Sequence, residues 1–241
     1  MWIFGQIKKI LFWLFPFYCL GCGQEDRTLC NRCLEKVPRL ERQVCAYCRV
    51  EMAGGRTCDF CFEEGAQLNG LLVASIYEKK SLLAKCLHNF KYNGQLDYGN
   101  TLIVLMNKFL LETEFNWGKI TICPIPIFPE KQRSRGFNQC EILANGINIP
   151  GERSNLLKRI SYQKAQMTLS GEARLANVKG VFEYNGENFP EKLEKVLLVD
   201  DVATTLATLE EAALTLRGAG VKEVYGLVLA RENFEIETNR L

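Results

Sequence analysis

Histidine is the scarcest of the chemically useful residues in this chain of 241 residues, because His88 is the only one. Any catalytic or metal site that needs two imidazoles from one chain is therefore excluded. A lone histidine beside Leu87 and Phe90 is more typical of a helix surface or of packing than of proton transfer. The formal net charge is only +2, so charge alone does not indicate a nucleic-acid or membrane partner.

Long apolar runs are missing as well. After Lys8 and Lys9 the apolar run spans only residues 10–15, and no A-x-A-like cleavage site follows it. The sequence therefore predicts no transmembrane segment, no secretory signal and a cytoplasmic location. Apolar residues recur at helical spacing within residues 1–16, which predicts an amphipathic helix. This helix is expected to dock on the protein itself or, as the alternative, on a membrane surface.

No phosphate-binding loop of the type G-x-x-x-x-G-K-[ST] occurs in the chain. This absence matters for the segment 195–231, where a Val-Leu-Leu-Val run ends in the pair Asp200-Asp201. Without the loop, the run is not expected to be the acidic strand of a nucleoside triphosphatase. No aspartate follows Asp201, so a receiver domain is not expected either. A buried strand whose acidic residues merely cap the next helix remains the structural alternative.

The residues around the acidic pair predict a site for a sugar phosphate. The apolar run is typical of a strand buried on both faces of a parallel sheet, and such sheets bind ligands beyond the carboxyl ends of their strands. Asp200 and Asp201 lie at that end, where carboxylates can bind ribose hydroxyls. Threonines then open the next helix, whose unpaired N–H groups attract a phosphate. They are Thr204, Thr205 and Thr208.

Cysteine, by contrast, is abundant, and eight of the eleven cysteines form four CxxC pairs in the first quarter of the chain. Two such pairs complete a tetrahedral tetrathiolate site, so four pairs predict two zinc sites. Zinc is favoured over disulfides because CxxC pairs make poor structural disulfides; iron is a minor alternative. The spacing leaves sequential and crossed pairing open. The predicted ligands are Cys19, Cys22, Cys30, Cys33, Cys45, Cys48, Cys58 and Cys61.

These pairs predict a double zinc ribbon over residues 17–64. A segment of this length cannot bury an apolar core large enough to fold alone. Bound metal is therefore expected to stabilise it in place of such a core. A tetrathiolate site has no open coordination position, which argues against catalysis there. Arginines in the ribbon could contact nucleic acid, but glutamates offset them. The other cysteines, Cys86, Cys123 and Cys140, are expected to be buried and unreactive thiols.

From residue 68 onward, strand and helix patterns alternate, which predicts an α/β domain with a mainly parallel sheet over residues 68–241. Strands are expected at 71–77, 120–123, around 196 and at 224–229. Helices are expected at 82–90, 96–111, 138–145 and 207–217. The polar stretch between 126 and 138 and the basic region up to residue 180 are expected to be loops.

Short motifs occur in a fixed order behind the cysteines. They are Lys91-Tyr92-Asn93-Gly94, Cys123-Pro124-Ile125-Pro126, Arg135-Gly136-Phe137-Asn138-Gln139, Gln166, Arg174, Asn177-Val178, Phe182 and Val199-Asp200-Asp201-Val202 with Thr204-Thr205. Together they resemble the ComF competence-protein family over nearly the whole chain. The resemblance implies a type I phosphoribosyltransferase fold, binding of phosphoribosyl pyrophosphate, and handling of single-stranded DNA in natural transformation, in contact with proteins of the DNA-uptake machinery.

The resemblance also implies roles for single residues. Asp200 and Asp201 are assigned to the ribose hydroxyls, and the turn Pro124-Ile125-Pro126 to the pyrophosphate. The 5′-phosphate is assigned to Thr204, Thr205, Ala207 and Thr208, and Lys91 is a further substrate-binding residue. The loops that close over the leaving group are assigned to Arg135, Arg159, Lys164, Gln166 and Arg174. Arginines acting with Mg²⁺ would stabilise the departing pyrophosphate. The same basic residues could instead form a solvated or DNA-contacting surface.

One position departs from the family pattern Thr-Thr-Gly-x-Thr, because Leu206 occupies the glycine position. A bulky side chain there is expected to weaken phosphate binding or to mark a chain that has lost transferase chemistry. Two hypotheses follow. The first is a magnesium-dependent phosphoribosyltransferase-like enzyme. The second is a non-catalytic module that binds single-stranded DNA or a protein partner and retains only the remnant of a nucleotide site.

Overall fold

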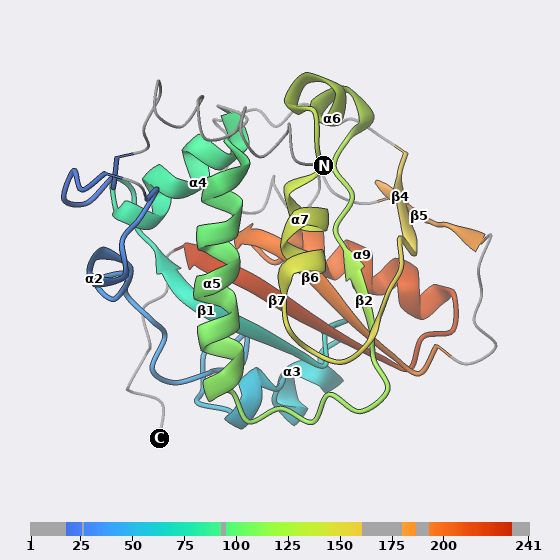
Figure 1. The fold of residues 1–241 in the computed structure, drawn as a ribbon. Coiled ribbons are helices and arrows are strands. Elements are labelled where there is room, and N and C mark those ends of the chain that lie inside the picture. Colours follow the sequence, from blue (N-terminus) through green and yellow to red (C-terminus); the bar gives the residue numbers. More distant parts are fainter. Residues whose placement is uncertain (1–17, 26, 93–94, 161–179, 187–192, 233–241) are drawn as a thin grey trace.

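The computed structural model describes residues 18–25, 27–92, 95–160, 180–186 and 193–232 (Figure 1). The helix expected within residues 1–16 lies outside the described residues. The same is true of Lys164, Gln166 and Arg174. Within the described ranges, no helix combines the length and apolarity needed to cross a membrane.

A five-stranded parallel sheet forms the centre of the molecule (Figure 1). Its strands, in spatial order, are β1 (Gly70–Tyr77), β7 (Glu223–Glu232), β6 (Lys195–Ala203), β2 (Thr121–Pro124) and β3 (Glu152–Arg153). Each neighbouring pair is parallel. The predicted α/β class with a mainly parallel sheet is therefore confirmed.

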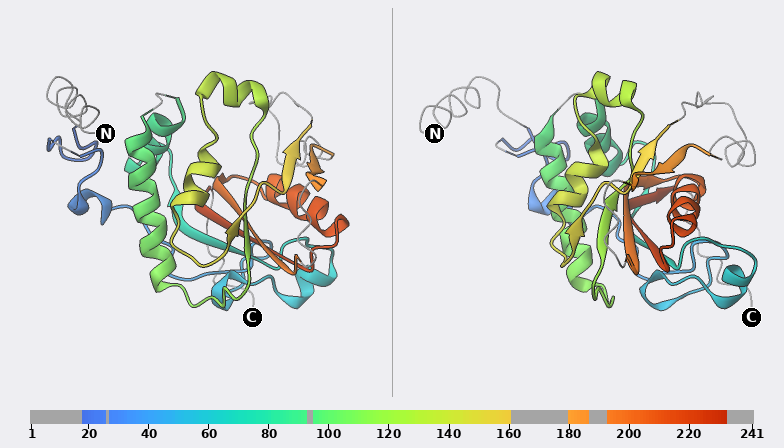
Figure 2. Two further views of the ribbon diagram at one scale, coloured as in Figure 1. Left: turned by 45° about the vertical axis from the view of Figure 1, so that its right-hand side comes forward. Right: turned by 90° about the vertical axis from the view of Figure 1, so that its right-hand side faces the viewer.

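Helices cover both faces of this sheet (Figures 1 and 2). The helices α4 (Leu82–Tyr92), α5 (Leu96–Glu112) and α7 (Gln139–Gly146) lie over one face, and α9 (Ala207–Gly218) lies over the other. Successive residues of a strand point to opposite faces. Accordingly, Leu197 and Val199 join the core beneath α5, whereas Val196 and Leu198 join the core beneath α9. Burial on both faces explains the unbroken apolar run in β6.

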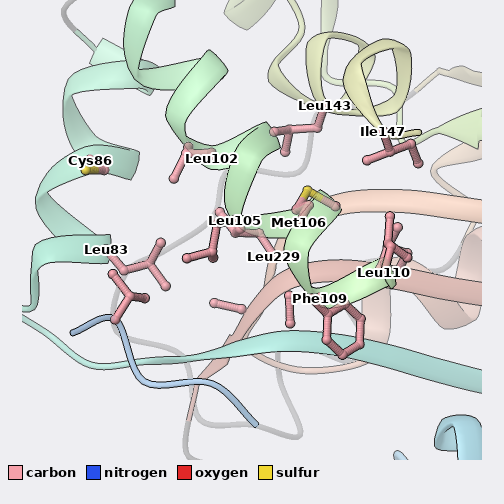
Figure 3. Packing of buried hydrophobic residues seen from close by; sticks show 14 of the residues in the cluster. Leu83, Cys86, Leu102, Leu105, Met106, Phe109, Leu110, Leu143, Ile147 and Leu229 are labelled. Atoms are coloured by element: carbon pink, nitrogen blue, oxygen red, sulfur yellow. The ribbon is translucent and has the colours of Figure 1, made fainter. Parts of the chain in front are cut away.

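The core beneath α5 is the larger of the two clusters, and Figure 3 shows its packing. Leu102, Met106 and Phe109 of α5 face Leu143 and Leu229 across the interface (Figure 3). These residues are all buried. Phe90 of α4 packs in the same cluster beside Gly99 of α5, and this contact holds the end of α4 that carries Lys91.

A short helix and two short strands occupy regions that the sequence predicted as loops, and there the prediction was wrong; a third short strand, just past residue 180, lies where the sequence predicted no element. The helix α6 (Pro129–Arg135) begins on a proline and ends at Gly136, whose φ of 86° stops the helix. Both are helix-boundary residues that the sequence displayed. The antiparallel pair β4 (Leu157–Arg159) and β5 (Phe182–Tyr184) has three residues per strand, too few for an alternating pattern to be recognised.

The cysteine-rich segment divides between the two faces of the sheet (Figure 2). Its first part, which includes α2 (Asn31–Leu34), packs with α4 and α5 through Cys19 and Cys33. Its second part, which includes η1 (Ala53–Gly55) and α3 (Asp59–Glu63), packs near α9 through Leu40 and Ala46.

Near the start of the second part, the chain passes the edge of β1. There the Gln43 side chain both donates to the Val73 carbonyl and accepts from the Val73 N–H, each at 3.0 Å. A paired edge is protected from pairing with another chain.

Candidate functional site

The candidate site lies where β6 and β2 end side by side. The chain leaves β6 towards α9 on one face and leaves β2 towards α6 and α7 on the other. Neighbouring connections that depart to opposite faces mark the position where open parallel sheets bind ligands. The structure thus places the sequence-predicted acidic pair at the point in the fold where a ligand site is expected.

Asp200 and Asp201 lie inside β6, which continues to Ala203. The sequence placed the pair at the end of the strand, so this end moves by two residues, from Asp201 to Ala203. The thiol of Cys140 donates to Oδ1 of Asp200 at 3.2 Å, and the backbone N–H of Asp201 donates to the same oxygen at 2.8 Å. These contacts fix the orientation of the Asp200 carboxylate.

Asp201 is only 4% exposed and forms an ion pair with Lys91 at the end of α4. Gln139 adds a hydrogen bond from Nε2 to Oδ1 of Asp201 at 3.5 Å. The other end of the Gln139 amide accepts from the guanidinium of Arg135. Arg135 itself lies 5.5 Å over the ring of Tyr92. Residues from α4, α6 and α7 therefore converge on the acidic pair.

The two carboxyls carry different charges at neutral pH because their surroundings differ. Burial and the neighbouring Asp201 raise the pKa of Asp200 to about 7. Burial acts in the same direction on Asp201, but the Lys91 ammonium outweighs it and lowers the pKa of Asp201 below its usual value. Burial opposes the charge of Lys91, yet Asp201 raises its pKa overall. The site thus holds one stable ion pair and one carboxyl that titrates near neutrality.

This arrangement predicts a specific pH dependence of stability. A folded pKa of about 7 for Asp200, against 3.8 for an ordinary aspartate, means that the folded protein binds this proton more tightly than the unfolded chain does. The stabilisation is complete below about pH 4 and is lost as the pH rises to about 7. We expect Asp200→Asn to make the free energy of unfolding less dependent on pH across this window. Urea unfolding at several pH values measures it, and an unchanged slope would contradict the assignment.

Further positive charge surrounds the pair. Burial lowers the pKa of Lys131, and so do the neighbouring Arg159, Arg135 and Lys91. Burial also lowers the pKa of Arg159, whereas Asp200 acts on it in the opposite direction. The guanidinium of Arg159 lies 5.2 Å over the ring of Phe182. The basic residues of α4, α6 and β4 therefore form one electropositive group facing the acidic pair.

The turn after β6 carries the residues that the sequence assigned to a phosphate. Thr204 and Thr205 lie in the turn, and Ala207 and Thr208 open α9. Leu206, at the N-cap, has a φ of −77°, so this position does not require the left-handed conformation that favours glycine. Its side chain packs against the core beneath α9. The substitution therefore adds bulk without backbone strain.

The predicted pyrophosphate turn adjoins the same strand. Pro124 ends β2 opposite Val199, and the N–H of Ile125 donates to the Val199 carbonyl at 2.9 Å. Asn138, which caps α7, donates to the Ile125 carbonyl at 3.1 Å. Pro126 follows and is half-buried. In the register of the sheet, the turn therefore begins at Pro124, which lies opposite Val199, the residue before Asp200.

The eight cysteines of the four CxxC pairs form two clusters of four, and in each cluster the sulfur atoms all lie within 4.8 Å of one another. The structure groups them sequentially, as Cys19, Cys22, Cys30 and Cys33, and as Cys45, Cys48, Cys58 and Cys61. Burial raises the pKa of Cys19, but backbone N–H groups, first that of Cys30 at 3.3 Å, lower it to about 6. Four sulfurs at this spacing, with a stabilised thiolate among them, fit tetrahedral zinc.

Comparison with known proteins agrees with this picture. Residues 10–62 match the family model described as "Double zinc ribbon domain". The chain is 28% identical over 232 residues to Competence protein F of Haemophilus influenzae, covering 90% of this chain and 98% of the relative. It is 26% identical over 231 residues to Competence protein ComFC of Streptococcus pneumoniae, covering 88% and 99%. The chain is thus similar to competence proteins over most of its length.

A further relative of this chain is DNA utilization protein YhgH of Escherichia coli (strain K12). The two are 24% identical over 209 residues, or 83% of this chain and 89% of the relative. The zinc-ribbon match and the two cysteine clusters support zinc as the metal, as the sequence predicted.

Sequence reasoning missed two members of the site, Lys131 of α6 and Cys140 of α7. Cys140 was expected to be a buried, unreactive thiol, and it is buried, but it contacts Asp200. Burial and the neighbouring Asp200 and Asp201 raise its pKa well above the usual value, so it donates as a neutral thiol. Only its place directly after the motif ending in Gln139 could have indicated this. Cys86 and Cys123 are buried as expected, and burial raises the pKa of each to about 12. His88 is exposed on α4, also as expected.

The side chains alone provide fewer suitable ligands for Mg²⁺ than for zinc. One oxygen of each aspartate and the Cys140 sulfur lie within 4.8 Å of one another. Mg²⁺ prefers oxygen ligands and usually binds through one or two carboxylates together with substrate phosphates. The protonated thiol is a poor ligand, and Lys91 already neutralises Asp201. The Asp200 and Asp201 carboxylates are therefore the side chains that would hold Mg²⁺, and a phosphate compound and water would have to supply the remaining ligands.

Proposed function

We propose that this protein is a member of the ComF family and binds phosphoribosyl pyrophosphate, or a related ribose 5-phosphate, through a type I phosphoribosyltransferase-like domain. The observation that carries the proposal is that the acidic pair and the threonine turn occupy one strand-turn-helix unit. This unit lies where the connections of β6 and β2 diverge, and Lys91 faces it. That combination supplies carboxylates for hydroxyls, N–H groups for a phosphate and cations for a second charged group.

Each part of the proposed site has a distinct chemical role. Asp200 and Asp201 accept hydrogen bonds from the two ribose hydroxyls. The N–H groups of residues 204–208 bind the 5′-phosphate at the start of α9, where the helix dipole adds to the attraction. Arg135, Lys131 and Arg159 oppose the charge that develops on departing pyrophosphate. Bound Mg²⁺ supplies further neutralisation of that charge.

The names of the relatives support a role in DNA uptake. Two relatives are called competence proteins and a third is called a DNA utilization protein. We therefore propose that the chain acts on the cytoplasmic side of DNA uptake during natural transformation. Single-stranded DNA and proteins of the uptake machinery are the partners that this role implies.

A calorimetric titration with phosphoribosyl pyrophosphate and Mg²⁺ tests the ligand. We expect Asp201→Asn to weaken binding by at least about tenfold, because hydrogen bonds to a charged group contribute roughly 1.5–3 kcal/mol. Glu194→Gln is the matched control, since it removes an exposed carboxylate just before the start of the same strand, at the end away from the site. Equal affinities for wild type and Asp201→Asn would place the ligand elsewhere.

The same titration with Leu206→Gly measures the cost of the departure from the family pattern. Because Leu206 has an ordinary helical φ, we expect glycine to change affinity through side-chain bulk alone. Binding that appears only in Leu206→Gly would show that the wild-type turn no longer admits the phosphate. A non-catalytic role would then be the better description of this chain.

One observation favours the second candidate function, a DNA-binding module. Phe60 on α3 is 69% exposed, and the guanidinium of Arg217 lies 5.4 Å over the ring of nearby Phe62. Exposed aromatic rings beside cations are a common platform for stacking bases of single strands. Binding of single-stranded DNA that weakens with salt, and that is unaffected by the sugar phosphate and by Asp201→Asn, would support this candidate.

A further inference from the structure

The second cysteine cluster is tied to the first turn of α9 through one side chain. Tyr47 lies between Cys45 and Cys48, and its hydroxyl donates to Oε1 of Glu210. Glu210 is the residue whose N–H closes the first hydrogen bond of α9, to the Leu206 carbonyl at 2.8 Å. The segment from Cys45 to Cys48, called the knuckle below, therefore contacts α9 in its first turn, directly after the threonine turn.

The same knuckle is also linked, through Arg231, to Ala203, the residue that precedes the turn. The carbonyl of Ala46 accepts from the guanidinium of Arg231 at 2.6 Å. Arg231 is buried near the end of β7 and pairs in register with Ala203, the last residue of β6. The knuckle is consequently connected to both sides of the turn, through β7 on one side and through Glu210 on the other.

A short segment before β1 completes this arrangement. The N–H of Gln67 donates to Glu210 at 3.3 Å, and the N–H of Leu68 donates to the Tyr47 hydroxyl at 3.2 Å. Arg217, near the other end of α9, donates to the Gln67 carbonyl at 2.7 Å. Both ends of α9 are thus held by the segment that the knuckle packs against.

We propose that Tyr47 is a positioning residue for the turn 204–208, so that metal occupancy of the second cluster controls the geometry of that turn. Backbone N–H groups bind a phosphate well only when they are held in a fixed orientation, and a rigid support supplies this. The first cluster packs against α4 and α5 on the opposite face and has no such connection within the described residues. The consequence for ligand affinity rests on the proposed function.

Hydrogen exchange in the zinc-loaded, full-length protein tests the positioning role without a ligand. We expect Tyr47→Phe to speed exchange at the Glu210 N–H by about tenfold, the effect of losing one buried hydrogen bond. Glu210→Gln keeps an acceptor for Tyr47 and should stay closer to wild type than Glu210→Ala. Tyr225→Phe is the matched control, because its hydroxyl also bonds a glutamate, Glu223 at 3.0 Å, but at the other end of the sheet. Unchanged exchange in Tyr47→Phe, or an equal increase in the control, would overturn the proposal.

A second comparison separates the two clusters. Cys58→Ser is expected to speed exchange at Glu210, whereas Cys22→Ser is expected to leave it near the wild-type rate. Equal effects would indicate a general loss of stability and would refute a specific link. Titration with phosphoribosyl pyrophosphate should show roughly three- to tenfold weaker binding in Tyr47→Phe with its zinc content unchanged. If wild type binds none, the proposed ligand is wrong, while the exchange experiment still decides the role of Tyr47.

Discussion

Removal of zinc is expected to lower the melting temperature by at least about 10 °C, because a structural zinc site contributes roughly 10 kcal/mol or more of apparent binding free energy. The two clusters are built into opposite faces of the sheet, since Cys19 and Cys33 belong to the core beneath α5 and Ala46 to the core beneath α9. Loss of metal therefore disturbs both cores and is not confined to a separate appendage. Thermal unfolding with and without a strong chelator measures the effect.

Cysteine variants refine this experiment. Cys22→Ser and Cys58→Ser should each lower the zinc content from two ions per chain to one, because each removes a ligand from a different cluster. Cys86→Ala is the control, since this buried thiol lies outside both clusters. Protein that contains no zinc, or that melts at the same temperature with chelator, would disprove the structural role of the metal.

The sequence predicted the sheet, its buried strands and the long helices, because their apolar patterns are continuous over many residues. The runs 71–77 and 224–229 lie within β1 and β7, and 96–111 differs from α5 by one residue. The short elements α6, β4 and β5 contain too few residues for such patterns. The four CxxC pairs indicated two metal sites but could not reveal their sequential grouping, because either pairing of CxxC pairs completes a tetrathiolate site.

The candidate site was less accessible to sequence reasoning than the fold. The acidic pair and the threonines are neighbours in the chain, so a single segment displayed them. Lys91, Arg135 and Cys140 come from other elements, and only tertiary packing brings them to the aspartates. The resemblance to the ComF family named Lys91 and Arg135 through motifs, but it gave no indication that Lys91 pairs directly with Asp201. That ion pair carries the second large prediction.

Lys91→Met is expected to destabilise the protein by about 3 to 5 kcal/mol, because it leaves the carboxylate of Asp201 buried without its cation. Urea unfolding at neutral pH measures the loss. The matched control is Lys79→Met, because the Lys79 side chain is 84% exposed and its ammonium lies 3.9 Å from the Glu232 carboxylate. Such a surface pair contributes roughly 0 to 1 kcal/mol, so the control should be close to wild type.

The double variant Lys91→Met, Asp201→Asn distinguishes the ion pair from simple packing. If the loss in the single variant comes from an unpaired charge, neutralising Asp201 should recover most of it. The pH dependence gives a second criterion. Without Lys91, burial raises the folded pKa of Asp201, so the stability of the single variant should fall as the pH rises, with a smaller deficit at about pH 5 than at about pH 8. A deficit that is independent of pH and persists in the double variant would mean that the aliphatic part of Lys91, and not its charge, supports the site.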